Sequence, residues 1–213
     1  MIADKKRHAA EIGKRLKKLY PEVHVELDYG TPFELMIASI LAAQNTDVNV
    51  NKMTPVLFRK YRSPADYLAV PVEELEKDIY ASGFFRQKAK SIRAVSQKLI
   101  EDFGGNVPST MEELLTLPGI GRKTANVVLG DALGIAAGIV VDTHNIRLSS
   151  LLGLSDHKTA DKIERELMEL VPQKDWIQFG QWITWHGRRV CNAKRPKCPE
   201  CVLADICPSR KDE

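Results

Sequence analysis

The sequence predicts an all-α protein, and three observations carry that prediction. Apolar residues recur at helical spacing along most of the 213 residues. No stretch alternates between apolar and polar residues as a half-buried strand would. Pro, Gly, Ser and Thr fall at the boundaries of the periodic segments, where helices begin and end. Because 44% of the residues are hydrophobic, the chain has enough apolar side chains to fill a core.

The first predicted helix covers residues 5–19 and ends before Pro21, whose ring cannot continue a helix. The basic residues of this segment are predicted to form its solvated face. Its apolar face consists of Ala9, Ile12, Leu16 and Leu19.

A capping box predicts the start of the second helix. Thr31 and Glu34 have the spacing at which each side chain bonds to the backbone N–H of the other, and Pro32 suits the first helical position. This helix is predicted to run through Leu41. The elements that follow are a helix at about 47–61 that kinks or breaks near Pro55, two short helices that begin at Ser63-Pro64 and Pro71-Val72, and a helix at 86–103 that Gly104-Gly105 ends.

Residues 117–129 form the most informative stretch, Leu-Pro-Gly-Ile-Gly-Arg-Lys-Thr-Ala-Asn-Val-Val-Leu. Gly119 and Gly121 permit positive φ and the close approach of another backbone. The next helix is predicted to begin at Arg122, where its first N–H groups can bind a phosphate. The pattern predicts a helix-hairpin-helix motif that grips a nucleic-acid backbone without reading bases, with a tight turn between two core helices as the alternative. Three further helices are predicted at about 143–152, 157–170 and 175–188.

Two residues near this motif are candidates for chemistry. Lys123 is the second residue of the new helix, where the positive end of the dipole and the neighbouring Arg122 favour the neutral amine that a nucleophile needs. An ordinary solvated or phosphate-binding lysine is the alternative. Asp142 follows the apolar pair Val140-Val141 and is predicted to cap the helix at 143–152.

All four cysteines lie near the end of the chain, with the spacing C-x6-C-x2-C-x5-C. Disulfides are disfavoured because no export signal precedes them. Structural zinc more often uses two C-x2-C pairs, whereas four thiolates can also hold a [4Fe–4S] cluster, so both metal centres stay open with iron–sulfur favoured. Lys194 and Arg195 lie between the first two cysteines, which suggests a loop that binds phosphate. The cysteines are Cys191, Cys198, Cys201 and Cys207.

These motifs resemble the endonuclease III family of base-excision DNA glycosylases, in the same order and spacing over about residues 5–208. The resemblance implies a bifunctional DNA glycosylase and AP lyase that removes oxidised pyrimidines and cuts the abasic strand by β-elimination. It implies that Lys123 attacks the sugar C1′ and forms a Schiff base, and that Asp142 stabilises the positive sugar or takes a proton. It also implies that the four cysteines hold a [4Fe–4S] cluster.

Two more residues acquire roles from the resemblance. Gln44, in Leu41-Ala42-Ala43-Gln44-Asn45-Thr46-Asp47, matches the glutamine that enters the space left by a flipped base. Phe84, in Gly83-Phe84-Phe85-Arg86, matches an apolar wedge that unstacks bases, with a core aromatic as the alternative. Many relatives have Ser where Ala42 stands, so the preferred lesion stays open.

The resemblance implies two helical domains. One is a six-helix barrel at 25–135 that contains the hairpin. The other combines residues 1–24 with 136–213 around the iron–sulfur cluster. The expected partner is double-stranded DNA with a damaged pyrimidine or an abasic site, which suits the net charge of +3 and the pI of about 8.6.

The longest apolar run is too short to span a bilayer and no signal peptide is recognised, so a cytoplasmic, nucleoid-associated protein is expected. A monomer is expected because no interface pattern stands out in the sequence. Adenine-mismatch glycosylases carry a Glu before the Gln motif, and thymine–guanine mismatch glycosylases usually have Tyr in place of Lys123, so both are disfavoured. Two further classes stay open, a DNA-binding module with a structural metal and a redox sensor of DNA integrity.

Overall fold

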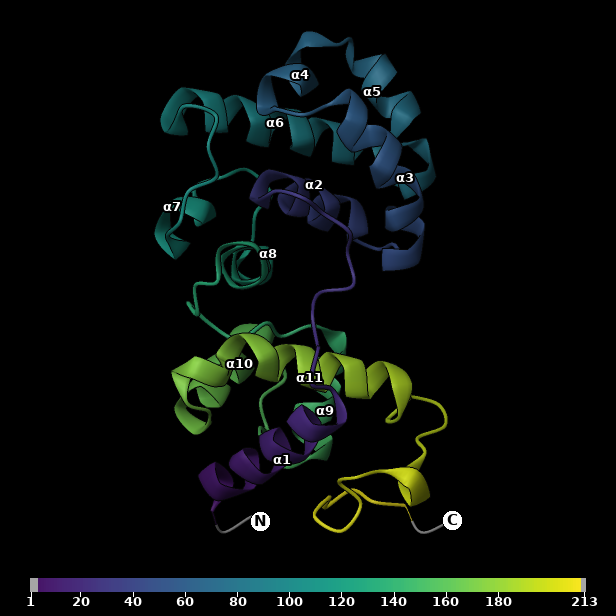
Figure 1. The fold of residues 1–213 in the computed structure, drawn as a ribbon, viewed down its shortest axis with the longest axis vertical. Helices are drawn as coiled ribbons and strands as arrows, with labels where there is room; N and C mark the ends of the chain where they lie inside the picture. The colour runs from purple at the N-terminus through teal and green to yellow at the C-terminus, as the bar shows by residue number, and fades with distance from the viewer. Residues whose placement is uncertain (1–3, 212–213) are drawn as a thin grey trace. The chain divides into compact units, whose positions relative to one another are not determined.

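The computed structural model describes residues 4–211, and within that range every regular element is a helix, as the sequence predicted (Figure 1). The chain divides into two compact units. Unit 1 comprises Met1–Val25 and Ala136–Glu213, and unit 2 comprises Glu26–Ile135. Among the described residues, no helix combines the length and the apolar character that crossing a membrane requires.

Unit 2 is built around α2 (Pro32–Ala42), whose residues Leu35, Met36, Ile37 and Leu41 are completely buried. This helix packs against α3, α6 and a π-helical segment at Val128–Ala132, while α4 covers another part of α6. The other helices are α3 (Asp47–Lys60), α4 (Pro64–Ala69), α5 (Val72–Asp78), α6 (Phe85–Phe103), α7 (Met111–Leu115) and α8 (Arg122–Val127), with a 3-10 turn at Tyr80–Ser82.

Two local predictions for unit 2 need correction. The Thr31 side chain accepts the Glu34 N–H at 3.1 Å as predicted, but Glu34 accepts the N–H of Gly30, at 2.6 Å, so the box closes one residue earlier. Helix α3 continues through Pro55 and does not break there. The Arg59 side chain donates to the Pro55 carbonyl at 3.0 Å, which adds a bond beside the proline.

Unit 1 has a core shared by α1 (Lys5–Leu19), α9 (Thr143–Leu151), α10 (Ala160–Leu170) and α11 (Trp176–Arg189). Helix α11 packs against both α1 and α9. Its Gly180 and Gly187 permit close approach to the segment before α9 and to α9 itself, because a Cβ would lie 2.9 Å from the Val140 carbonyl at the first and 2.9 Å from the His144 Cβ at the second.

The predicted apolar face of α1 is correct for Ala9, Ile12 and Leu16, which are buried, and wrong for Leu19, which is 40% exposed. The helix ends at Leu19, and the next residue, Tyr20, turns inward and is 7% exposed. Tyr20 therefore fills the core position that helical periodicity assigned to Leu19.

Candidate functional site

The predicted hairpin joins α7 to α8. Thr110 caps α7 by accepting the Glu113 N–H at 3.2 Å. Gly119 has φ +77°, a conformation that favours glycine, and lies beside Ser91. Gly121 differs from the expectation, since its φ of −93° is open to any residue. A Cβ at Gly121 would meet no atom within 4 Å, so this glycine leaves open space at the start of α8.

Lys123 is the second residue of α8 and its side chain is exposed. The following part of α8 is anchored, because Ala125, Asn126 and Val127 are buried in unit 2. The chain then continues directly into the π-helical segment at Val128–Ala132. A rigid helix start therefore presents Arg122 and Lys123 at its first turn.

Asp142 caps α9, as predicted. Its Oδ1 accepts the Asn145 backbone N–H at 2.8 Å and the Asn145 side-chain Nδ2 at 3.1 Å. Asn145 is completely buried, and its Nδ2 also lies 2.8 Å from Thr184 Oγ1 and 3.2 Å from the Gly180 carbonyl. Asn145 thus fixes the Asp142 carboxylate against α11. The sequence did not predict this role, since its only signal is an Asn three positions after an N-cap Asp.

Gln44 and Phe84 share a backbone feature and a pocket. They are the two non-glycine residues with positive φ in the described part of the chain, at 53° and 47°. Both line a pocket of about 280 Å³ in unit 2, together with Gly119 and Thr124. Phe84 is 68% exposed, so the core-aromatic alternative is wrong. We call this cavity the Gln44–Phe84 pocket.

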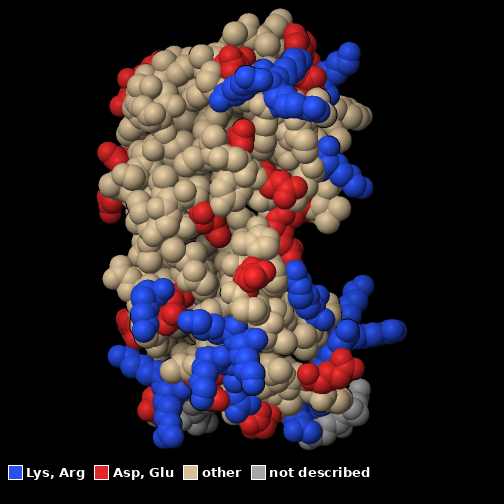
Figure 2. Space-filling view, in the orientation of Figure 1, with Lys and Arg blue, Asp and Glu red and all other residues tan. Residues whose placement is uncertain are grey.

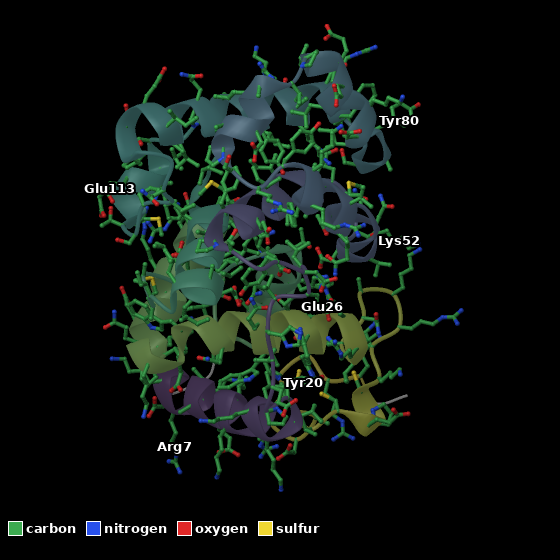
Figure 3. The ribbon with its side chains drawn as sticks, turned by 45° about the horizontal axis from the view of Figure 1, so that its top comes forward. Arg7, Tyr20, Glu26, Lys52, Tyr80 and Glu113 are labelled. Atoms are coloured by element: carbon green, nitrogen blue, oxygen red, sulfur yellow. The ribbon has the colours of Figure 1, made fainter. Side chains whose placement is uncertain are left out.

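Two further aromatic residues, Tyr80 and Phe85, belong to the same segment as Phe84. Tyr80, labelled in Figure 3, is 67% exposed, and its ring centre lies 4.9 Å from that of Phe85. The Arg86 guanidinium lies 5.3 Å from the centre of the Phe85 ring. Residues 80–86 thus combine the exposed rings of Tyr80 and Phe84 with the cation of Arg86, a mixture suited to nucleotides.

Lys88, which no sequence pattern singled out, also lines the Gln44–Phe84 pocket and is only 6% exposed. Its ammonium donates to the Leu41 carbonyl at 2.7 Å and to the Ser82 carbonyl at 2.8 Å. Burial lowers the pKa of this amine. The first carbonyl precedes Gln44 by three residues and the second precedes Phe84 by two.

The four cysteines line one pocket of about 240 Å³ in unit 1, and each is half-buried. We call it the cysteine pocket. Cys201 Sγ lies 3.3 Å from His186 Nε2 and accepts the Leu203 N–H at 3.4 Å, while Arg147 donates to Cys191 Sγ at 3.7 Å. Lys194 and Arg195 are exposed on the loop between Cys191 and Cys198.

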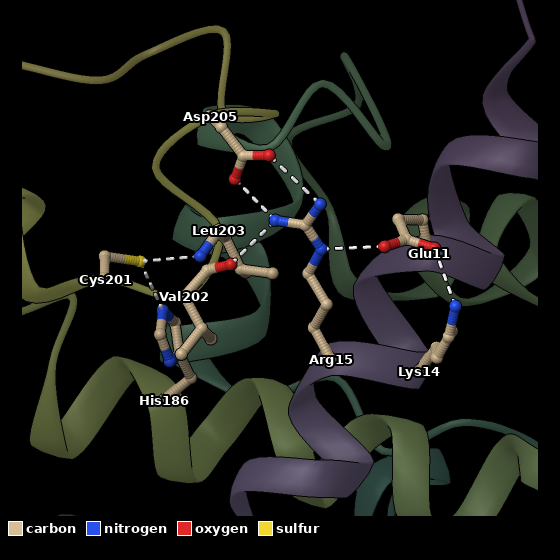
Figure 4. Close-up of polar contacts among 8 residues, drawn as sticks. All are labelled: Glu11, Lys14, Arg15, His186, Cys201, Val202, Leu203 and Asp205. Atoms are coloured by element: carbon tan, nitrogen blue, oxygen red, sulfur yellow. Dashed lines mark hydrogen bonds and ion pairs between the residues drawn. The ribbon is translucent and has the colours of Figure 1, made fainter.

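Arg15 of α1 holds the last part of the cysteine loop in place (Figure 4). It donates to the Val202 carbonyl at 2.9 Å and binds both carboxylate oxygens of Asp205, with Nη2 to Oδ2 at 3.0 Å. Glu11 accepts from Arg15 Nε at 2.8 Å and so orients the guanidinium. On the face in view, Lys and Arg side chains gather over α1 and the cysteine loop of unit 1 (Figure 2).

The hairpin, the anchored α8 and the cysteine loop define the chain as an all-helical helix-hairpin-helix protein. Residues 37–173 match the family model described as HhH-GPD superfamily base excision DNA repair protein. The chain is 52% identical to endonuclease III of Synechocystis sp., over 98% of this chain and 95% of that protein. It is 46% identical to endonuclease III of Bacillus subtilis, over 91% of this chain and 88% of that protein.

Solved structures agree. A non-covalent endonuclease III–DNA complex matches with a TM-score of 0.92 and 42% identity, covering 98% of this chain and 97% of the matched chain. A thermostable thymine-DNA glycosylase shares the fold, with a TM-score of 0.85 at 24% identity. The chain belongs to the endonuclease III family, whose members are DNA glycosylases with AP lyase activity in base excision repair.

Proposed function

We propose that this chain excises oxidised pyrimidines from duplex DNA with Lys123 as the nucleophile. The observation that carries the proposal is the exposure of Lys123 in the first turn of α8, directly after the hairpin, on a helix whose next turn is buried in unit 2. A lysine held in this way can reach a sugar without moving the backbone, which places the amine near its target before reaction.

The reaction balances as an exchange at C1′ followed by an elimination. The neutral Lys123 amine attacks C1′, the C1′–N bond to the base breaks, and the base leaves with a proton. The Lys123 nitrogen gives up one of its two protons, the C1′–O4′ bond breaks as O4′ takes a proton from solvent, and a protonated C=N bond forms. Loss of a C2′ proton then expels the 3′ phosphate, which cuts the strand.

Asp142 supplies the carboxylate of this reaction in our proposal. An anion stabilises the positive charge that develops on the sugar, and it can hold the proton that the attacking amine releases. The bonds from Asn145 hold this carboxylate in one orientation, and that preorganisation is what electrostatic catalysis needs.

DNA binding is assigned to three groups of residues. Gly119, Gly121 and Arg122 present backbone N–H groups and a cation to a phosphate at the start of α8. Gln44 and Phe84 enter the duplex from the rim of their pocket, where Gln44 meets the base left without a partner and Phe84 separates neighbouring bases. Lys194 and Arg195 bind phosphates from the cysteine loop.

The cysteine pocket fits a [4Fe–4S] cluster better than a single zinc ion. Thiolates that share one zinc each lie about 2.3 Å from it, so their sulfur atoms crowd around one point. Within residues 4–211 no group of three or more His, Cys, Asp or Glu side chains is arranged to hold a single metal ion. Cys191, Cys198, Cys201 and Cys207 all line one pocket of about 240 Å³. A bound cluster would tie the loop to α11 and shape its basic segment.

The two compact units are taken as the functional domains, with the barrel and hairpin in unit 2 and the cluster in unit 1. The partner is double-stranded DNA that carries a damaged pyrimidine or an abasic site. A DNA substrate of this kind also suits a monomer in the cytoplasm, associated with the nucleoid.

Product analysis on a duplex with one thymine glycol tests this function. We expect release of the modified base together with strand cleavage that leaves a 3′-unsaturated aldehyde. Base release with an intact strand would indicate a monofunctional glycosylase. Binding without base release would leave only a DNA-binding module. An undamaged duplex of the same sequence is the control and should stay intact.

A further inference from the structure

The Gln44 and Phe84 segments lie far apart in the sequence, yet one side chain bonds to both. Lys88 lies in the first turn of α6, four residues after Phe84. It is almost inaccessible to solvent, at 6% exposure, and its ammonium donates to the carbonyls of Leu41 and Ser82. Each carbonyl belongs to the chain just before one of the two DNA-inserting candidates.

Both segments need such a constraint. Gln44 and Phe84 adopt φ values of 53° and 47°, which cost free energy for residues that carry a Cβ. The Leu41 carbonyl belongs to the last turn of α2, where carbonyl groups have no partner within the helix. A charged donor to such carbonyls forms stronger hydrogen bonds than a neutral one. Lys88 can therefore hold both strained segments in place.

We propose that Lys88 is a positioning residue that fixes the Gln44 and Phe84 segments in one arrangement, so that both side chains engage the duplex together. This inference rests on the proposed roles of Gln44 and Phe84 in DNA insertion. It goes beyond them because it makes the two insertions interdependent. Lys88 itself contacts no DNA in this account and acts through the two carbonyls.

A mutant cycle on DNA binding tests the inference. The probe is a duplex with a tetrahydrofuran abasic analogue and 2-aminopurine beside it, so that affinity and base unstacking are read from one titration. We expect Lys88→Met to weaken binding about tenfold and to reduce the unstacking signal. On the Gln44→Ala/Phe84→Ala background, Lys88→Met should cause no further loss, because the residues it positions are absent.

Three controls separate positioning from general damage. Lys90→Met removes an exposed lysine two residues along the same helix and should change affinity less than about threefold. Lys88→Arg keeps the charge and the donors and should restore most of the binding. Borohydride trapping at saturating abasic DNA should stay at the wild-type level in Lys88→Met, since Lys123 is intact.

An equal loss from Lys88→Met on both backgrounds would overturn the inference. If Gln44→Ala and Phe84→Ala bind and unstack the duplex like the wild type, their proposed roles fail, which is a separate result. If Lys88→Met does not fold, hydrogen exchange of the Phe84→Ala variant, with and without DNA, tests the coupling instead. There we expect DNA to protect residues 43–46 less than in the wild type, and unchanged protection would contradict the coupling.

Discussion

The two pockets of this protein are similar in size but are built by different means. The Gln44–Phe84 pocket measures about 280 Å³ and owes its shape to two strained backbone positions and a buried lysine. The cysteine pocket measures about 240 Å³ and is lined by four thiols on a loop that Arg15 ties to α1. The first is suited to engaging a partner and the second to holding a resident group. Substitutions in the two should therefore fail in different ways.

The largest effect is expected in the cysteine pocket. Cys198→Ser should remove one cluster ligand, and because cluster binding contributes to folding, iron content and thermal stability should fall together. Iron per chain, visible absorption and thermal unfolding measure this. Normal iron content and an unchanged melting temperature in this variant would rule out the assigned ligand set.

The next effect belongs to the Gln44–Phe84 pocket. Phe84→Ala should weaken binding to an abasic duplex about tenfold, because stacking on one base contributes roughly 1–3 kcal/mol. The same variant should keep the wild-type iron content. Affinity measured by fluorescence anisotropy checks the first statement and an iron assay the second. If Phe84→Ala instead lost iron and bound DNA normally, the roles assigned to the two pockets would be contradicted.

Arg15→Met should produce a smaller change in the cysteine loop. It removes the bonds to Val202 and Asp205 but leaves every cysteine in place. Because the ion pair is partly exposed, we expect cluster loss to a chelator to accelerate only about two- to fivefold. The decay of visible absorption gives this rate. Lys14→Met, one residue away, is the matched control and should decay like the wild type.

The smallest expected effect concerns backbone strain. Glycine tolerates the positive φ found at Gln44 and Phe84. Gln44→Gly and Phe84→Gly should therefore each be about 0.5–1 kcal/mol more stable than the corresponding alanine variants, although glycine usually stabilises a folded chain less than alanine does. Denaturant unfolding measures the difference. More stable alanine variants would show that neither position is strained.

Local features of this chain were predictable and long-range ones were not. The caps at Thr31 and Asp142 and the helix end at Gly104 follow from residues within a few positions of each other. The roles of Lys88 and Asn145 were not predicted, because their hydrogen bonds join residues that are 47 and 39 positions apart in the sequence. The positive φ of Gln44 and Phe84 also leaves no local signal, since neither is a residue that favours it.

Two local predictions differ from the structure. Periodicity alone assigned Leu19 to the core, but the core position went to Tyr20 once the helix ended. Helix α3 was expected to kink or break near Pro55, and the structure contradicts the break, since the helix continues through that residue.

Borohydride trapping with site mapping tests the central claim most directly. The protein is incubated with an abasic duplex and reductant, and the covalent complex is digested and analysed by mass spectrometry. We expect the sugar remnant on Lys123 and no complex from Lys123→Ala, which should still bind the duplex. A complex that persists in Lys123→Ala, or an adduct on another lysine, would contradict the assignment of the nucleophile.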